Sequence, residues 1–231
     1  MIPLVLLPGH MCDARLWAPQ LAALSGTRTL HLPEIASADR MEALAAAVLR
    51  DAPPRFALAG LSMGGILAME VLRQAPARVE RLALLDTNPL PEAEEARAAR
   101  RARMARVAAG GLEEVLRDEM KPLYLAEPSL GLLALCLDMG LRLGPDAFLR
   151  QSRALMDRPD QTATLAAFRG PALVLHGEED RLVPPDRARL MARLMPQARL
   201  EWVAGAGHLP PLERPEATTS ALARWLEEPS P

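Results

Sequence analysis

Short apolar runs alternate with amphipathic segments along the first 85 residues of the chain. Residues 2–7 form a wholly apolar run that stops at Pro8-Gly9, which is typical of a strand buried on both faces of a parallel sheet. The pattern predicts strands at 2–7, 27–32, 56–59 and 81–85, and helices at 13–24, 40–49 and 64–74. Strands that alternate with helices indicate an α/β fold, with a mainly parallel sheet flanked by helices.

This alternation stops in the middle of the chain. From about residue 91 to residue 164 no run predicts a strand, and the spacing of apolar residues predicts helices at 92–109, 111–120, 129–143 and 146–156. Two further strands, at 172–175 and 199–203, and a helix at 216–227 complete the pattern. We therefore expect a core of residues 1–90 and 165–231, interrupted by an all-helical cap at residues 91–164.

The strongest chemical motif is Gly60-Leu61-Ser62-Met63-Gly64, which lies between a predicted strand and a predicted helix. It fits the Gly-x-Ser-x-Gly nucleophile elbow, in which a sharp turn exposes the serine above the sheet. Small residues on both sides leave room for that turn, and the helix directs its N–H groups at the place where negative charge develops. The motif predicts Ser62 as a nucleophile.

Two later loops supply the partners that a nucleophilic serine needs. Asp180 follows the strand at 172–175, and His208 lies in a glycine-rich loop after the strand at 199–203. The order Ser62, Asp180, His208 is the order in which this fold places nucleophile, acid and base. Asp86, at the end of an earlier strand, is the alternative acid. His176 is expected to be structural, and His31 to lie near the rim of the pocket.

An oxyanion hole requires two backbone N–H groups that face the reacting carbonyl oxygen. One is expected from Met63, the residue after the nucleophile, and the other from the loop after the first strand. In that loop we favour the amide of His10, with the adjacent Met11 as the alternative.

Taken together, these motifs resemble those of the α/β-hydrolase superfamily, and especially small bacterial serine carboxylesterases such as the pimeloyl-carrier-protein methyl ester esterases. The resemblance covers nearly the full chain and is most specific in the three loops that hold Ser62, Asp180 and His208. It implies an α/β-hydrolase fold and a hydrolase that acts on ester bonds. Many relatives have His-Gly after the first strand, where this chain has Pro8-Gly9-His10, so the loop near the pocket departs from the family pattern.

The expected reaction is cleavage of a carboxylic ester of a small or medium-sized apolar acyl group through an acyl-enzyme intermediate. A lactone, a thioester or a C–C bond beside a carbonyl would use the same groups, and a non-catalytic ligand-binding member of the fold is the other alternative. Apolar residues of the cap are expected partly to form a lid and partly to pack on the core. They are Leu123, Leu125, Leu130, Leu132, Leu133, Leu135, Met139 and Leu141.

Charge and composition limit which substrates and binding partners we expect. The net charge is −2, and arginines at 97, 100, 101, 103 and 106 are interspersed with glutamates, which favours a solvated helix face over a site for an acidic substrate or a carrier protein. We expect a small-molecule ester substrate, no nucleic acid and no membrane, and neither a metal nor an organic cofactor. The oligomeric state is left open. Two cysteines, the absence of a basic leader and a strand-like start favour a cytoplasmic protein.

Overall fold

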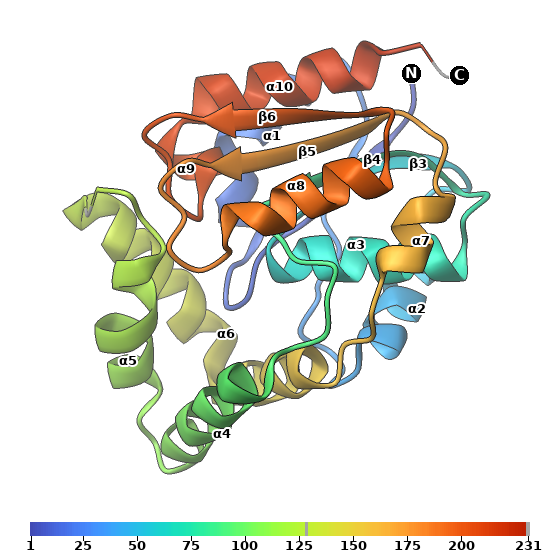
Figure 1. Cartoon of the computed structure of the whole chain (residues 1–231). Coiled ribbons are helices and arrows are strands. Elements are labelled where there is room, and N and C mark those ends of the chain that lie inside the picture. Colours follow the sequence, from blue (N-terminus) through green and yellow to red (C-terminus); the bar gives the residue numbers. More distant parts are fainter. Residues whose placement is uncertain (128, 230–231) are drawn as a thin grey trace.

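Six parallel strands form one sheet at the centre of the computed structural model, which describes residues 1–127 and 129–229 (Figure 1). In chain order the strands are β1 (Leu4–Leu7), β2 (Leu30–His31), β3 (Phe56–Leu61), β4 (Val79–Leu85), β5 (Ala172–Gly177) and β6 (Ala198–Val203). Their order across the sheet is β2-β1-β3-β4-β5-β6, with every neighbouring pair parallel. The predicted α/β fold with a mainly parallel sheet is therefore confirmed.

The central strands are buried on both faces, which explains why their sequences are continuous apolar runs. β1, β3 and β5 have no exposed residue. At the edge of the sheet β2 is shorter than the predicted strand at 27–32, because only Leu30 and His31 pair with β1 and Pro33 lacks the N–H that a longer ladder requires.

Helices cover both faces of the sheet. One face packs against α2 (Met41–Asp51), α3 (Met63–Gln74), α7 (Thr162–Ala167) and α8 (Pro185–Leu194). The other packs against η1 (Ala14–Trp17), α1 (Ala18–Leu24), α9 (Pro210–Glu213) and α10 (Pro215–Glu227). Side chains alternate between the two cores, so that Leu82 and Leu84 of β4 point to the first core, and Ala83 and Leu85 to the second.

The segment between β4 and β5 is helical. It consists of α4 (Glu94–Ala108), α5 (Leu112–Glu114), the π-helix η2 (Val115–Met120), the 3₁₀ helix η3 (Lys121–Leu123) and α6 (Leu130–Met156), followed by α7. In Figure 1, α4, α5 and α6 lie at the side of the sheet toward which β5 and β6 point. A separate apolar cluster joins Met11 to Val107, Leu116 and Phe148, so the segment packs against the loop after β1.

The helix predictions agree with the structure at one break but miss three helices. The predicted break between 129–143 and 146–156 is present inside α6, where Gly144 has φ 80 and is followed by Pro145. In contrast, α7, α8 and α9 were not predicted, and the expected boundary between residues 164 and 165 falls inside α7.

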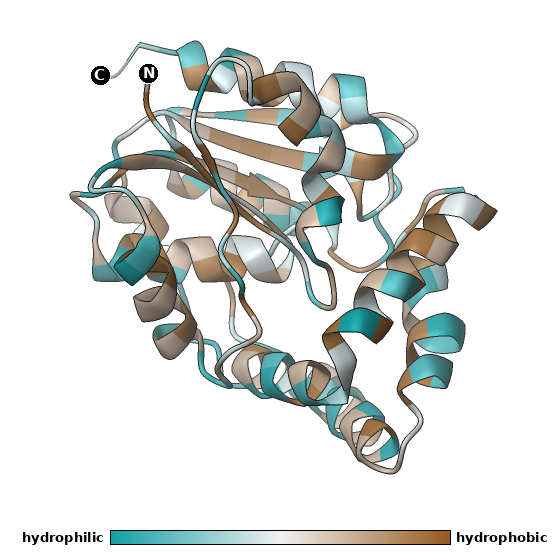
Figure 2. Ribbon diagram, turned by 180° about the vertical axis from the view of Figure 1, so that it is seen from behind, coloured by the Kyte–Doolittle hydropathy of each residue, from teal (hydrophilic) through white to brown (hydrophobic). Residues whose placement is uncertain are grey.

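The hydropathy colouring of Figure 2 is mostly brown along the strands and mixed teal and brown along the surrounding helices. No helix of the described residues is long and apolar enough to span a membrane.

Candidate active site

Ser62 occupies a strained turn between β3 and α3. Its backbone has φ 55 and ψ −116, a conformation that residues other than glycine rarely adopt. The Ser62 N–H donates to the carbonyl of Leu85 at 2.9 Å, and the Ser62 carbonyl accepts from Oγ1 of Thr87 at 2.7 Å. These two bonds to the neighbouring strand and the loop after it hold the turn in place.

The glycines of the motif make the turn sterically possible. A Cβ on Gly60 would lie 2.2 Å from the carbonyl oxygen of Gly64, and a Cβ on Gly64 would lie 2.2 Å from the carbonyl oxygen of Leu7. Both contacts are with backbone, which cannot move without displacing a strand or a helix. Glycine is therefore required at both positions by close approach of the chain.

The structure brings Ser62, His208 and Asp180 together from three different loops. His208 Nε2 lies 2.8 Å from Ser62 Oγ, and His208 Nδ1 lies 2.8 Å from Asp180 Oδ2. With its proton on Nδ1, the imidazole donates to the carboxylate and presents the lone pair of Nε2 to the serine hydroxyl. This arrangement can remove a proton from Ser62 and stabilise the cation that results.

Asp180 is held in its ionised form. Burial alone would raise the pKa of its carboxyl, but the charge and hydrogen bond of His208 outweigh that effect and lower the pKa. The backbone amides of Leu182 and Val183 also donate to Asp180 Oδ1, at 2.7 and 3.2 Å. The carboxylate is thus fixed at both oxygens.

Asp86, the alternative acid, lies beside Asp180 and forms neither a hydrogen bond nor an ion pair with His208. It is fully buried, with φ 43, and its Oδ1 accepts from the Gly177 N–H at 2.8 Å. Burial, followed by the nearby charge of Asp180, raises the pKa of Asp86 well above its ordinary value. The two carboxyl groups therefore have opposite preferences: the surroundings favour the ionised form of Asp180 and the protonated form of Asp86.

Asp86, Asp180 and His176 together have the chemistry of metal ligands. One carboxylate oxygen from each aspartate and one ring nitrogen of His176 all lie within 4.8 Å of one another. Asp180 is already bonded to His208, and Asp86 to Gly177. Because both aspartates already have these partners, we interpret the group as a buried polar cluster beside Asp180 rather than as a metal site. His176 packs edge-on against Trp202, which agrees with its expected structural part.

The loop after β1 contains both candidates for the second oxyanion donor, and their backbone amides differ in hydrogen bonding. The Met11 N–H donates to Gln151 Oε1 at 2.9 Å and is thus occupied. The His10 N–H makes no hydrogen bond to any group in the described part of the chain. Met63 is the first residue of α3, so its N–H has no acceptor within the helix. The geometry favours His10 over Met11 as the second oxyanion donor.

A cavity of about 840 Å³ opens onto Ser62, His10 and His208. Of the eight apolar cap residues expected to contribute to a lid, only Leu123 lines this cavity. Leu125 and Met139 are buried in the core, Leu132, Leu133 and Leu135 pack against it, and Leu130 and Leu141 are exposed. The wall comes instead from α4 and the loop before it, through Ala96, Ala99, Arg100 and Arg103 among others. His31, which was expected near the rim, does not line the cavity.

Sequence reasoning missed Glu213, which holds the His208 loop. Its carboxylate accepts from the backbone N–H groups of Gly207 at 3.0 Å, Leu209 at 3.0 Å and Ala126 at 2.7 Å. The His208 N–H also donates to the carbonyl of Tyr124 at 2.8 Å. A glutamate five residues after the histidine was the only available signal, and by itself it resembles any helix-end glutamate.

Comparison with known proteins identifies the family. A family model described as alpha/beta hydrolase family matches residues 4–221. The chain belongs to this family. A pimeloyl-[acyl-carrier protein] methyl ester esterase from Aromatoleum aromaticum is 30% identical and aligns with 92% of this chain and 93% of that protein. The protein of the same name from Citrobacter koseri is 27% identical, over 95% of this chain and 91% of that protein.

Solved structures of this family have the same fold. A thermophilic esterase from Thermogutta terrifontis superposes with a TM-score of 0.89 at 30% identity, covering 98% of this chain and 89% of that chain. An enol-lactonase from Burkholderia xenovorans superposes with a TM-score of 0.85 at 25% identity, covering 98% and 92%. The predicted family and enzyme class, a hydrolase, are confirmed.

Proposed function

We propose that this protein is a serine hydrolase that cleaves carboxylic esters through an acyl-enzyme intermediate. The proposal rests mainly on two contacts of 2.8 Å. One joins Ser62 Oγ to His208 Nε2, and the other joins His208 Nδ1 to Asp180 Oδ2. The names of the relatives, methyl ester esterase and esterase, support an ester as the substrate. A lactone is the second candidate, because an enol-lactonase shares the fold at 25% identity over nearly the whole chain.

In the first step His208 Nε2 takes the hydroxyl proton of Ser62 while Oγ attacks the ester carbonyl carbon. The carbonyl oxygen becomes an oxyanion that accepts hydrogen bonds from the N–H groups of Met63 and His10. His208 then gives its proton to the departing alcohol, and the C–O bond of the ester breaks. Water, deprotonated by His208, attacks the acyl-enzyme, and the acid product leaves with Ser62 restored.

The helical segment at residues 91–164 is proposed as a cap that selects the acyl group. It supplies part of the wall of the cavity that contains Ser62, through α4, η3 and the loop before α4. Excluding water from this cavity would strengthen the contacts to the oxyanion. A cavity of about 840 Å³ fits an ester with a small or medium-sized acyl group.

Labelling with a fluorophosphonate and hydrolysis of p-nitrophenyl butyrate test the proposal. The wild-type protein should label at Ser62, and Ser62→Ala should lose labelling and hydrolysis, the latter on the order of a millionfold where the assay allows. Ser220→Ala, at an exposed position of α10, is the matched control and should behave as wild type. Hydrolysis that survives in Ser62→Ala would overturn the assignment of the nucleophile. An unlabelled, inactive wild type would indicate a ligand-binding member of the fold.

A further inference from the structure

The cavity above Ser62 has more positive than negative side chains in its wall. Four arginines line it in the described part of the chain, and two glutamates. They are Arg100, Arg103, Arg158 and Arg187, with Glu92 and Glu119. Asp86 also lines the cavity, but burial and the charge of Asp180 raise its pKa and so favour its neutral form. An apolar acyl group alone gives no reason for this excess of guanidinium groups.

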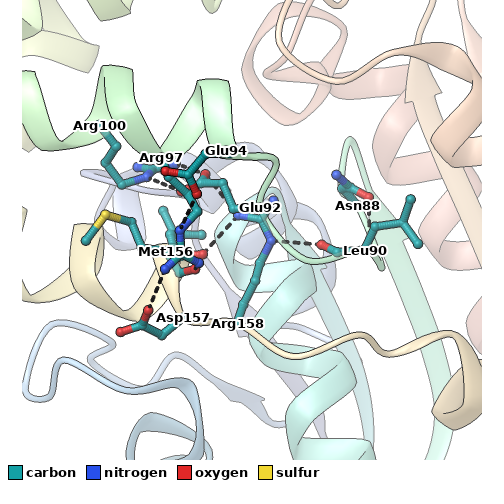
Figure 3. A network of polar contacts seen from close by, with 10 residues as sticks. Asn88, Leu90, Glu92, Glu94, Arg97, Arg100, Met156, Asp157 and Arg158 are labelled. Carbon is teal, nitrogen blue, oxygen red and sulfur yellow. Dashed lines mark hydrogen bonds and ion pairs between the residues drawn. The ribbon is translucent and has the colours of Figure 1, made fainter.

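Ion pairs within the wall leave part of the positive charge uncompensated. Arg100 and Arg158 both bond to the single carboxylate of Glu92, at 2.6 and 3.1 Å, as Figure 3 shows. Glu119 is likewise shared between Arg103 and Arg106. Each group has two guanidinium ions and one carboxylate, so each retains one positive charge.

Arg187 differs from the other three arginines because it forms no ion pair with a described residue. It is the third residue of α8, close to Leu182 and Val183 of the loop that carries Asp180. The Nε atom of this half-buried side chain is shielded from solvent and has no hydrogen-bond acceptor in the described residues. A shielded donor without an acceptor costs free energy, which a bound anion would recover.

The pKa of His10, which also lines the cavity, supports a positive field there. Burial lowers the pKa of His10 well below its ordinary value, and the charges of Arg100, Lys121 and Arg103 lower it further. The field therefore favours negative charge over positive charge in the region between the oxyanion loop and α4.

We propose that Arg187 binds a carboxylate of the substrate, at the end remote from the ester bond. A guanidinium forms two parallel hydrogen bonds with a carboxylate, and the two clusters around Glu92 and Glu119, each with one excess positive charge, add an attractive field. The substrate class is then a half-ester of a dicarboxylic acid or another ester with an anionic terminus. This inference rests on the proposed esterase function, because it places the ester carbonyl at Ser62.

Monomethyl adipate and dimethyl adipate are suitable probes, because they have the same chain and the far end is a carboxylate in one and a neutral methyl ester in the other; rates for the dimethyl ester are halved to correct for its two ester groups. Wild-type kcat/KM should be at least about tenfold higher for the monomethyl ester at pH 8. Arg187→Gln should lower kcat/KM for monomethyl adipate roughly 10- to 100-fold, the range of a charge-assisted hydrogen bond, and leave dimethyl adipate within about twofold. Equal rates for both esters in the wild type, or an equal loss for both in Arg187→Gln, would overturn the proposal.

Arg189→Gln is the matched control. Arg189 lies on the same helix and has the same charge, but it pairs with Asp186 at 2.9 Å, lies over the ring of Trp202 and does not line the cavity. This variant should retain the wild-type preference for the monomethyl ester. A loss of preference equal to that of Arg187→Gln would show that only the general charge of α8 matters and would contradict a specific site.

Calorimetry with adipate on the Ser62→Ala protein separates this proposal from the proposed function. Adipate should bind, adipamide should not, and adding Arg187→Gln should weaken adipate binding at least about tenfold. If no ester is hydrolysed but adipate binds in this way, the esterase proposal fails and the anion site stands. If esters are hydrolysed but adipate binding does not depend on Arg187, the anion site is refuted.

Discussion

Asp86 and Asp180 show how the surroundings of two neighbouring aspartates can shift their pKa values in opposite directions. Asp180 has a hydrogen-bonded histidine and two backbone amides on its carboxylate, which favour the charged form. Asp86 is fully buried and faces that negative charge, which favours the neutral form. A neutral Asp86 can accept from Gly177 with one oxygen and donate its proton toward Asp180 with the other.

The two aspartates should therefore respond differently to the same substitution. Asp180→Asn should leave His208 in the wrong tautomer and lower kcat for ester hydrolysis by about 10⁴. Asp86→Asn should change kcat by less than about tenfold, because the amide keeps the acceptor for Gly177 and a donor toward Asp180. Steady-state kinetics on a p-nitrophenyl ester at pH 8 measure both. If the two losses were reversed, the acid that serves His208 would be Asp86.

The same Asp86→Asn variant should have a stability gain that depends on pH. The pKa of Asp86 is raised in the folded protein, so above the ordinary carboxyl pKa the folded state keeps a proton that the unfolded state has lost. The free energy of unfolding of the wild type then falls as pH rises through this window, by up to about 1.4 kcal/mol per pH unit. Asparagine has no such proton.

Urea denaturation at pH 4, 6 and 8 checks this expectation. The difference in unfolding free energy between Asp86→Asn and wild type should grow in favour of the variant from pH 4 to pH 8. A difference that stays constant across the three pH values would mean that Asp86 has the same ionisation in both states.

At the scale of elements, the residues of the site lie in loops that follow strands. Residues of the cap form hydrogen bonds with two of these loops and with the glutamate that holds one of them. Glu213 at the end of α9 bonds to the loop on both sides of His208 and also to Ala126. Lys121 Nζ donates to the carbonyl of Met11 at 3.3 Å, and the Tyr124 hydroxyl donates to the carbonyl of His10 at 3.5 Å. One short segment of the cap therefore holds both the oxyanion loop and the histidine loop.

Glu213→Gln should test this connection. A glutamine has one oxygen where the carboxylate has two, so its amide nitrogen would face a backbone donor. We expect unfolding free energy to fall by about 1–3 kcal/mol, and kcat to fall more than KM rises, because His208 loses its fixed orientation. Urea denaturation and ester kinetics measure the two effects. Glu216→Gln, at an exposed position of α10, is the control. An unchanged kcat in a destabilised variant would show that Glu213 serves stability alone.

Elements with a strong hydrophobic pattern could be predicted from the sequence, and weakly patterned ones could not. Strands such as β3 and β5 are buried on both faces, so each is a continuous apolar run. α8 is rich in charged residues and its apolar stripe is narrow, because only Ala188 and Met191 of the helix are buried. The positions of Ser62, Asp180 and His208 follow from local motifs after strands. The contacts of Gln151 and Glu213 depend on segments far apart in the chain, which no local pattern encodes.

At the scale of the whole molecule, the placement of the helical segment decides which residues meet the substrate. The leucines of α6 pack mainly on the core, whereas α4 turns Ala96 and Ala99 toward the cavity above Ser62. α4 is also poor in large apolar residues, and Val107 is its only buried residue. The acyl group therefore meets small side chains and guanidinium groups on this wall, and large apolar side chains such as Ile66 and Leu155 elsewhere in the same cavity.

The dependence of hydrolysis on acyl length should accordingly respond to α4. Each methylene that the cavity accommodates should contribute at most about 0.8 kcal/mol, or roughly fourfold in kcat/KM, until the space is filled. A series of p-nitrophenyl esters from acetate to decanoate should therefore show a maximum at short or medium length. Ala96→Leu adds bulk at the wall and should move that maximum toward shorter chains, as should Ala99→Leu.

Two controls separate the cavity wall from the rest of the cap. Ala98→Leu adds the same bulk to an exposed position of α4 that does not line the cavity, and it should leave the maximum where it is. Leu132→Ala removes bulk from a residue packed against the core, so it should lower stability without changing the profile. If Ala96→Leu and Ala99→Leu both left the profile unchanged, α4 would not contact the acyl group. A shift caused by Leu132→Ala would instead place the acyl chain against α6.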